Sequence, residues 1–444
     1  MSTSTEDNPP PVPARDKPGG EIYARWAWVE PEVWTERMLT ALETGMKGNQ
    51  WFSLIDKVYR LETLAIGWEH VRSNAGGSGV DHMTVERFAK DCPRGLLALQ
   101  EQLRQGVYQP SPVKRCWIPK PGTNQKRPLG IPTVRDRIVQ TALRVVLEPI
   151  FEDRFATHSY GFRPGRGCKD ALRRVQQLLD EGCTWIVDAD LKSYFDTIPH
   201  RRLMARVGER IADGRILALI QSYLEQGVLD GFGAYEAGEY GTPQGAVISP
   251  LLANVYLDPL DHLMAEHGLQ MVRYADDFVI LCRSEEEAKA ALARVQRWVE
   301  DNGLTLHPQK TRIVDVTQPG GFDFLGYHFE RGYRWPRKKS LQQLKDRIRD
   351  LTARTSGHSL EYCIAKLNTR LRGWFGYFQH SHRTTFPSVD AYVRGRLRAI
   401  LRKRAGRRGR ATGRDHQRWP NHYFTARGLF SLTAAHAAAC QPQP

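Results

Sequence analysis

Three aspartates near the ends of expected β-strands place the strongest constraint on how this chain folds. Residues 185–191 read Trp-Ile-Val-Asp-Ala-Asp-Leu, a β-branched strand pattern that ends in acids. Residues 271–274 and 278–282 are two further apolar strand patterns, and the stretch between them puts Asp276 and Asp277 at the tip of a tight hairpin. Carboxylates that meet in a fold repel one another unless a cation lies between them. The pattern therefore predicts adjacent strands around a divalent-metal site.

Two acids of the first strand are candidates for such a site. A strand has a period of two residues, so Asp188 and Asp190 share one face. Two divalent cations about 4 Å apart need several carboxylate oxygens around them. An Asp-Asp pair is also ordinary turn chemistry, so these residues taken alone leave a metal site and a structural turn both open.

Seven short motifs occur along the chain in the order that is typical of reverse transcriptases. They are Arg127-Pro-Leu-Gly-Ile-Pro132, Tyr160-Gly-Phe-Arg-Pro164, Asp190-Leu-Lys-Ser-Tyr-Phe195-Asp196, Thr242-Pro-Gln-Gly245, Tyr274-Ala-Asp-Asp277, Leu306-His-Pro-Gln-Lys310-Thr311 and Phe324-Leu-Gly326. On these motifs the chain resembles the bacterial group II intron-encoded reverse transcriptase and maturase family. The resemblance covers about residues 50–435 and is greatest to the compact members that lack an endonuclease domain.

The resemblance implies a two-metal polymerase centre. Asp190, Asp276 and Asp277 would then hold two Mg²⁺ ions, which orient the primer 3′-OH and neutralise the leaving pyrophosphate. We prefer Asp190 to Asp188 because an aromatic residue follows five positions later, where the family has its steric gate. Lys310 resembles the lysine proposed to protonate the pyrophosphate, and an ordinary surface lysine is the alternative interpretation.

The resemblance also implies a deoxynucleotide site. Phe195 would close it against a ribose 2′-OH, and the alternative is a phenylalanine of the core. Lys120 and Arg127 border a basic, Gly-containing loop that would clamp the triphosphate, although a solvated charged hairpin has the same composition. Gln244 and Gly245 would lie against the incoming nucleotide and the template.

Positive charge is concentrated near one end of the chain. Residues 331–418 contain 24 Lys and Arg against 5 Asp and Glu, whereas the whole chain has a net charge of +15. Such a stripe suits a nucleic acid, and a basic solubilising segment is the alternative. The candidate nucleic-acid contacts are Arg163, Arg337, Lys338, Lys339, Arg402, Lys403, Arg404, Arg407 and Arg408.

The expected fold class is α+β, a right-hand polymerase followed by a helical domain. The Pro-rich residues 1–20 are expected to be disordered. Residues 21–330 would form fingers and palm with an antiparallel sheet. Residues 331–400 carry three amphipathic helical patterns and would form the thumb, or maturase, domain. Residues 401–444 would be a basic nucleic-acid-binding extension.

The resulting functional hypothesis is an RNA-dependent DNA polymerase of a group II intron. Its expected partners are dNTPs, an RNA template with a DNA primer, and the intron RNA, whose splicing and retrohoming it would assist. One alternative is a domesticated or defence-associated reverse transcriptase. Another is an RNA-binding splicing factor with a vestigial polymerase site. The oligomeric state is left open, with a homodimer as one option.

The sequence also bears on location. The seven cysteines form no Cys-x-x-Cys pair, which favours a reducing compartment over a disulfide framework. No run of eighteen apolar residues occurs, and residues 1–20 lack the basic and apolar regions of a secretory signal. We therefore expect a cytoplasmic bacterial protein with no membrane partner.

Overall fold

The computed structural model consists of two compact units that alternate along the chain. The first unit combines residues up to 116 with 128–155 and 195–256, and the second combines 117–127, 156–194 and 257 onward. The chain thus passes between the units several times. The residues that the structure describes are 21–45, 48–119, 126–230, 235–236, 240–407 and 413–440.

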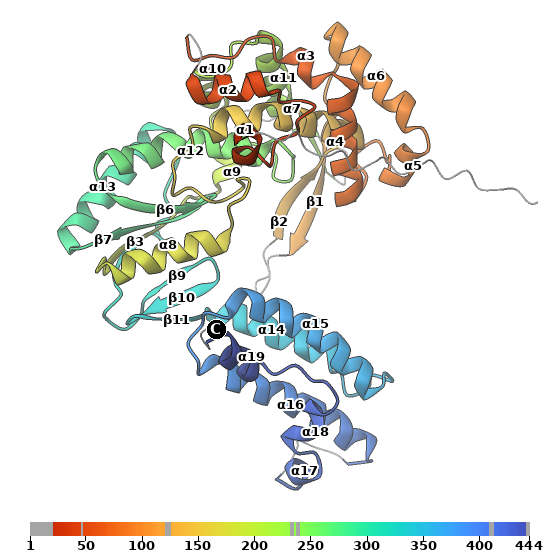
Figure 1. Ribbon diagram of the computed structural model, residues 1–444, viewed down its shortest axis with the longest axis vertical. Coiled ribbons are helices and arrows are strands. Elements are labelled where there is room, and N and C mark those ends of the chain that lie inside the picture. The colour runs from red at the N-terminus through yellow and green to blue at the C-terminus, as the bar shows by residue number, and fades with distance from the viewer. Residues whose placement is uncertain are drawn as a thin grey trace, which may run out of the picture. The chain divides into compact units, whose positions relative to one another are not determined.

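The first unit is mostly helical (Figure 1). Its helices are α1 (Glu21–Arg25), α2 (Glu36–Thr44), α3 (Ile55–Val58), α4 (Leu61–Asn74), α5 (Val85–Ala89), α6 (Cys92–Gln105), α7 (Val134–Glu152), α9 (Tyr194–Thr197), α10 (His200–Gly208), α11 (Gly214–Glu225) and the first part of α12 (Ser249–Glu266). Its strands β1 (Val113–Pro119), β2 (Lys126–Ile131), β4 (Val228–Leu229) and β5 (Tyr235–Glu236) form one sheet in the order β2-β1-β4-β5. The tips of β1 and β2 and the first residue of α9, Tyr194, belong to the second unit.

Helix α7 is the centre of the first unit. It is apolar on most of its circumference and therefore buried, and α4 packs along it. Thr133 begins the helix because its hydroxyl accepts a hydrogen bond from the backbone of Asp136 at 3.1 Å. The indole of Trp34 donates to the carbonyl of Val145 at 3.1 Å and ties the N-terminal helices to α7.

The second unit contains the four-stranded antiparallel sheet expected for a palm. Its strands are β3 (Trp185–Asp190), β6 (Gln270–Tyr274), β7 (Asp277–Cys282) and β8 (Arg312–Asp315), in the order β6-β7-β3-β8. Helices α8 (Cys168–Asp180) and α13 (Glu285–Asp301) lie on opposite sides of this sheet (Figure 1). The expected hairpin is confirmed, because β6 and β7 pair antiparallel and Tyr274 lies opposite Asp277.

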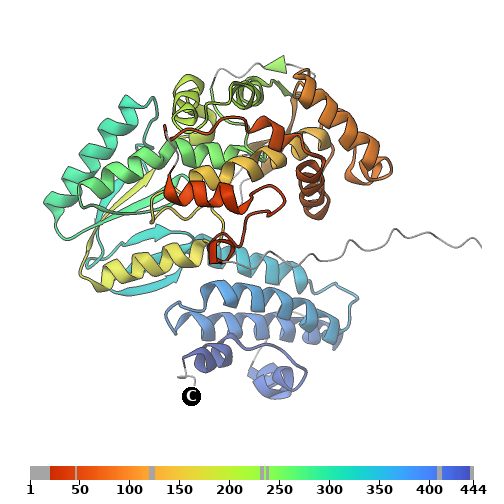
Figure 2. The ribbon, with the colours of Figure 1, turned by 45° about the horizontal axis from the view of Figure 1, so that its top comes forward.

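A small sheet and a helical domain complete the second unit. Strands β9 (Phe322–Phe324), β10 (Tyr327–Glu330) and β11 (Tyr333–Pro336) form an antiparallel sheet in the order β11-β10-β9. The three expected basic helices are α14 (Lys338–Leu351), α15 (Leu360–Phe378) and α16 (Thr385–Arg404), coloured blue in Figure 2. They pack around one apolar core.

The described part of the C-terminal segment packs on the same helical core. It contains α17 (Gly413–Arg418), α18 (Asn421–Thr425) and α19 (Leu432–Ala439). Trp419, Phe424 and Leu432 are buried with the side chains of α14 to α16. The buried carboxylate of Asp390 accepts two backbone hydrogen bonds at the start of α19. These residues therefore belong to the helical domain and do not form a separate arm.

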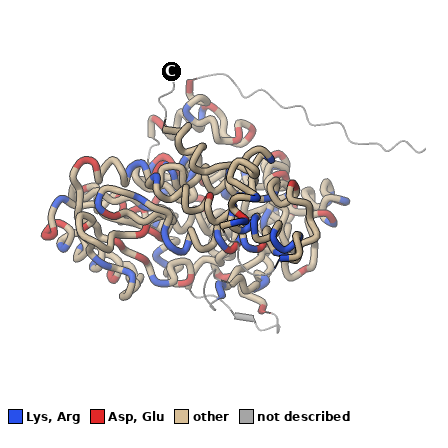
Figure 3. The backbone as a smooth tube through the Cα atoms, turned by 90° about the horizontal axis from the view of Figure 1, so that it is seen from below, with Lys and Arg blue, Asp and Glu red and all other residues tan. Residues whose placement is uncertain are grey.

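Charged residues of both signs lie along most of the described chain (Figure 3). Part of the excess of Lys and Arg in residues 331–418 is exposed on two helices, on α14 as Lys338, Lys339, Arg347 and Arg349 and on α16 as Lys403 and Arg404. Among the residues that the structure describes, no helix has the length and the apolar character needed to cross a membrane.

Candidate functional site

The three expected aspartates come together at one end of the palm sheet. Strands β3 and β7 are neighbours, and their register puts Asp190 directly opposite Asp277. Asp276 precedes Asp277 in the two-residue turn between β6 and β7, where Ala275 has a φ of 60°. Directly opposed residues of an antiparallel pair have Cβ atoms about 5 Å apart on the same face. The carboxylates of this cluster are therefore close enough to act on one ligand.

Burial and mutual repulsion raise the pKa values of the cluster. Burial raises the pKa of Asp277 to about 7, and the neighbouring acids Asp188, Asp276 and Asp190 contribute to that rise. Burial also raises the pKa of Asp276, with a contribution from Asp190. The pKa of Asp188 rises to about 6 through burial, although the nearby Arg312 opposes that rise. The site thus holds more negative charge than its protein surroundings neutralise.

Two cations accompany the acids. The Lys310 ammonium lies 2.6 Å from Oδ2 of Asp190, and the Lys310 side chain is 59% exposed. Arg312 lies opposite Asp188 in the pairing of β8 with β3, and its Nε is 3.3 Å from Oδ2 of that acid. Asp190 lies directly opposite Asp277 of the hairpin, whereas Asp188 lies two residues farther from the hairpin turn along β3, opposite Val279. This placement favours Asp190 as the acid that works with the hairpin.

The donor chemistry of the cluster suits a hard divalent cation. Mg²⁺ and similar ions take oxygen ligands, and carboxylates are their usual protein ligands. Within the described residues, no three His, Cys, Asp or Glu side chains already surround a single ion-sized point. Oδ2 of Asp190 is held by the Lys310 ammonium at 2.6 Å, so a cation bound through this oxygen would compete with Lys310 for it.

Two residues that the sequence reasoning missed hold the hairpin in place. Arg273 is fully buried, and its guanidinium donates to both carboxylate oxygens of Asp261 on α12, with Nε at 2.8 Å from Oδ1 and 3.0 Å from Oδ2. The same guanidinium donates to the carbonyl of Ala275 at 2.9 Å. A charged residue inside an apolar strand pattern is the signal that could have indicated such a buried pair. Arg273 is therefore a positioning residue for the acid-bearing turn.

Gly161 allows another segment to approach the same turn. The backbone N–H of Tyr160 donates to the carbonyl of Arg273 at 2.9 Å, so the motif that contains Gly161 runs beside β6. A Cβ atom on Gly161 would lie 2.2 Å from the backbone nitrogen of Ala275. Only glycine fits at this distance, which explains the glycine of the Tyr-Gly-Phe-Arg-Pro motif.

The first unit brings together three of the expected nucleotide contacts. The carbonyl of Phe195 accepts a backbone hydrogen bond from Thr242 at 2.7 Å, which joins the expected gate to the loop that carries Gln244. The amide of Gln244 donates to the carboxylate of Asp196 at 3.1 Å. Gly245 has a φ of 108°, and a Cβ there would lie 2.6 Å from the carbonyl of Gly130 in β2.

Basic candidates also lie near the acid cluster of the second unit. Arg127 is close enough to Asp276 to oppose the rise of its pKa, and Arg337 has the same effect on the pKa of Asp277. Lys120, the other expected phosphate contact, lies outside the described residues.

The structure separates the expected nucleic-acid contacts into two groups. Lys338, Lys339 and Lys403 are exposed. In contrast, Arg163 is 6% exposed and donates to the carbonyls of Ala156 and Ser159, at 2.6 and 2.8 Å. The interpretation of Arg163 as a nucleic-acid contact is therefore wrong, because its guanidinium is used to shape its own loop.

The basic C-terminal run is partly used inside the helical domain. Arg402 forms an ion pair with Asp415, which is fully buried, and Arg407 lies 4.0 Å from the same acid. Arg404 donates to the carbonyl of His358. These three side chains hold the C-terminal segment to α16 and the α14–α15 connection, which reduces their availability to phosphates. Arg408 lies outside the described residues.

Comparison with known proteins gives two family matches and several relatives. Residues 118–329 match the reverse transcriptase (RNA-dependent DNA polymerase) family, and residues 341–419 match the group II intron maturase-specific domain. Protein YkfC of Escherichia coli (strain K12) is 34% identical over 347 residues, which cover 69% of this chain and 86% of YkfC. The group II intron-encoded protein LtrA of Lactococcus lactis subsp. cremoris is 36% identical over 210 residues, which cover 47% of this chain and 34% of LtrA.

A solved structure is similar over part of the chain. A chain of a partial Cas6-RT-Cas1–Cas2 complex is 26% identical, with a TM-score of 0.37, and the match covers 58% of this chain and 43% of that chain.

The contact between Arg273 and the Ala275 carbonyl can be tested by Arg273→Lys. Lysine keeps the charge opposite Asp261 but lacks the planar, five-donor guanidinium that contacts both oxygens of the acid and the carbonyl together. Because a small displacement of the turn misplaces the acids, we expect kcat for primer extension to fall about tenfold or more, with KM for the template unchanged. Arg294→Lys on the exposed face of α13 is the matched control. A rise in KM with unchanged kcat would argue against a positioning role.

The charge repulsion at Asp277 can be tested by the stability of Asp277→Asn without divalent ions. Burial raises the folded-state pKa of this acid to about 7, so wild-type stability falls as pH rises from the unfolded pKa toward that value. Asparagine cannot ionise, so the variant avoids the cost of a buried charge at this position. Its free energy of unfolding should therefore be higher than that of wild type by about 2 kcal/mol near pH 8, and by less near pH 5. The measurement is urea unfolding in EDTA at both pH values. A lower urea midpoint for the variant near pH 8 would show that the carboxylate stabilises the fold.

Proposed function

This chain belongs to the family of group II intron-encoded reverse transcriptases and maturases, and on that basis we propose that Asp190, Asp276 and Asp277 form its polymerase centre. A reverse transcriptase domain precedes a maturase-specific domain. The expectations of an α+β polymerase fold, RNA-directed DNA polymerase activity and a role in intron splicing are confirmed by these family matches and by the relative LtrA, a group II intron-encoded protein.

The register between β3 and β7 is the observation that carries this proposal. It places Asp190 opposite Asp277, next to Asp276, at the end of the sheet where the Asp190 side chain is partly exposed. Members of the reverse transcriptase family use divalent metal ions, and we propose Mg²⁺ as the ion that these three acids would hold. Bound there, it would supply the positive charge that activates the primer 3′-OH and stabilises the leaving pyrophosphate.

Lys310 would serve two states of the centre. Its ammonium neutralises Asp190 in the present structure, at 2.6 Å. When the carboxylate turns to its ligand role, the ammonium is released and can donate a proton to the departing pyrophosphate. The exposure of the Lys310 side chain is compatible with this movement.

We assign nucleotide selection to the loop system of the first unit. Phe195 would exclude a ribose 2′-OH, and its backbone bond to Thr242 fixes the gate to the Gln244 loop. Gly245 lets the backbone of this loop approach β2 closely. Lys120 and Arg127 would bind the triphosphate.

We propose the intron RNA as the partner of the helical domain. The exposed Lys338, Lys339 and Lys403, with Arg337, are the side chains best placed for phosphates, and affinity should depend on salt accordingly. The same protein would support retrohoming of the intron by copying its RNA into DNA. The seven cysteines are unpaired, which supports the proposed location in a reducing cytoplasm.

The polymerase centre can be tested by Asp276→Ala. Loss of one of three carboxylates should lower primer extension on an RNA template with dNTPs and Mg²⁺ by at least about 1,000-fold, because the acid acts directly on the reacting groups. RNA affinity should be unchanged, and terbium luminescence in the aspartate site should disappear. The control is Asp350→Ala on the exposed face of α14. If wild-type protein bound RNA but extended no primer, the vestigial splicing factor would be the better interpretation.

The gate can be tested by Phe195→Ala. Removing the ring should raise kcat/KM for ribonucleotides relative to deoxynucleotides by about tenfold or more, because the 2′-OH no longer meets a side chain. The measurement is single-nucleotide incorporation with matched dNTP and rNTP pairs. Unchanged sugar discrimination in an otherwise active variant would assign Phe195 to the core.

A further inference from the structure

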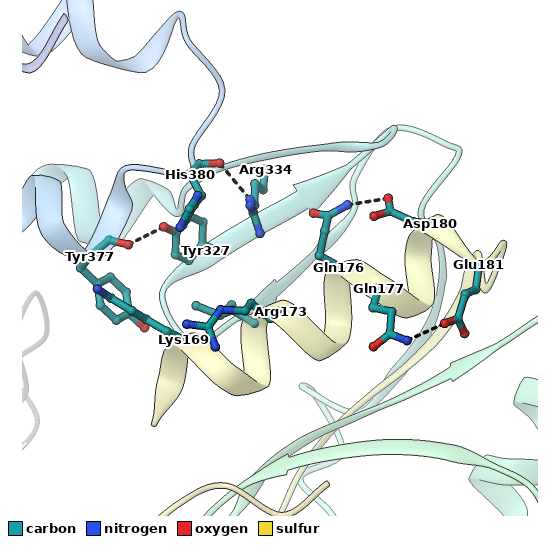
Figure 4. Close-up of a pocket in the computed structure, with 11 residues that line it drawn as sticks. Lys169, Arg173, Gln176, Gln177, Asp180, Glu181, Tyr327, Arg334, Tyr377 and His380 are labelled. Carbon is teal, nitrogen blue, oxygen red and sulfur yellow. Dashed lines mark hydrogen bonds between the residues drawn. The ribbon is translucent and has the colours of Figure 1, made fainter. Parts of the chain in front are cut away.

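A cavity of about 480 Å³ lies in the second unit and is not part of the aspartate cluster. Helix α8 forms one wall, strands β10 and β11 form another, and the end of α15 closes it (Figure 4). Its volume is within the range of sites that bind small organic groups. None of the residues assigned above to catalysis or nucleotide selection lines it.

The cavity has a basic end whose cations are incompletely neutralised. Arg334 is partly buried, its Nε donates to the carbonyl of His380 at 2.8 Å, and no carboxylate of the described residues lies within ion-pair distance. Lys169 also forms no ion pair in the described chain, and Arg173 pairs with Asp170 alone. Withdrawing a guanidinium from water without a counter-ion costs several kcal/mol. The arrangement therefore suits an anionic ligand.

The acids of the cavity form no ion pair with these cations in the described chain, although Asp180 is close enough to Arg334 to oppose the lowering of its pKa by burial. Asp180 accepts a hydrogen bond from Gln176 at 2.9 Å, and Glu181 accepts one from Gln177 at 2.8 Å. Figure 4 shows both acids at the C-terminal end of α8, whereas Lys169 is near its start. Cations in the first turns of a helix are disfavoured by the helix dipole, so a bound anion there would offset both the dipole and the unpaired positive charge.

Aromatic rings lie beside the cations. Tyr327 is 2% exposed, and its hydroxyl donates to the carbonyl of Tyr377 at 2.6 Å. The guanidinium of Arg334 lies 6.0 Å from the centre of the Tyr327 ring, and Tyr377 is partly exposed. Flat rings next to cations suit an unstacked base joined to a phosphate. An acidic peptide would satisfy the cations but would make no use of the rings.

We propose that this cavity binds one nucleotide of a single RNA strand. The phosphate would contact Lys169, Arg173 and Arg334, and the base would lie against Tyr377. The assignment rests on the proposed function in one respect, since it takes RNA as the source of the nucleotide. A free nucleotide has the same chemistry, so the test must separate the two sources.

The test uses the full-length protein and two cavity variants, Lys169→Glu and Arg334→Gln. Lys169 is exposed and forms no ion pair with the described residues, so its replacement should leave the fold intact, which circular dichroism checks. Arg294→Glu on α13 is the matched control, because it makes the same charge change outside the cavity. Affinity for an unstructured RNA of about 15 nucleotides is measured by fluorescence anisotropy over a range of salt concentrations.

Both cavity variants should bind this RNA about fivefold more weakly or worse. The slope of log affinity against log salt should decrease by about 0.7 for each phosphate that the variant no longer neutralises. The control variant Arg294→Glu should show a smaller change both in RNA affinity and in the salt slope. Extension of a short primed template at saturating concentration should stay within about twofold of wild type, because the cavity is separate from the acids.

Two results would overturn the assignment. Equal RNA affinity of wild type and both cavity variants would remove the cavity as an RNA site, while normal primer extension by the same samples would leave the polymerase function standing. Saturable binding of AMP that is abolished by Arg334→Gln, together with unchanged RNA affinity in that variant, would assign the cavity to a free nucleotide. A wild-type protein that extends no primer would instead count against the proposed function.

Discussion

The second unit must hold three negatively charged carboxylates close together against their mutual repulsion. Asp190 and Asp277 face each other across two paired strands, and Asp276 adjoins them. The backbone ladder holds these positions, since a slip of one residue would turn the side chains to the other face of the sheet. The buried pair of Arg273 and Asp261 adds a second restraint by fixing the carbonyl of the turn. The fold thus keeps together carboxylates that would separate if they were free, and this makes the site able to attract a divalent cation.

The residues proposed for metal binding and those proposed for nucleotide selection belong to different units of the chain. The acid cluster and Lys310 belong to the second unit, whereas Phe195 and Gln244 belong to the first. The boundary falls after Tyr194, so only a short segment links Asp190 to the expected gate. Within the helical domain, basic residues also have two roles. Arg402 is held by the buried Asp415, while other basic side chains on these helices remain exposed for phosphates.

Most of the local structure could be predicted from the sequence because it depends on short patterns. β-Branched runs that end in acids predicted β3 and the β6–β7 hairpin, and three apolar stripes at helical spacing predicted α14, α15 and α16. The basic residues were harder to interpret. Arg163 carries a guanidinium group, which is typical of phosphate contacts, yet this group is buried and donates to two carbonyls of its own loop. Arg273 received no role, although its burial and its hydrogen bonds to Asp261 and to the Ala275 carbonyl make it a principal support of the site.

By itself the sequence determined which strands carry acids, which family the motifs resemble and where positive charge accumulates. These properties depend on residue type and on short spacing, both of which a linear chain retains. Only the tertiary structure decided which partner each charged group meets. Lys310 reaches Asp190 from 120 positions away, and the cavity joins α8 to residues of β11 and α15. The strength of an ionic contact falls with distance and rises with burial, and both quantities are set by packing between segments that are remote in the sequence.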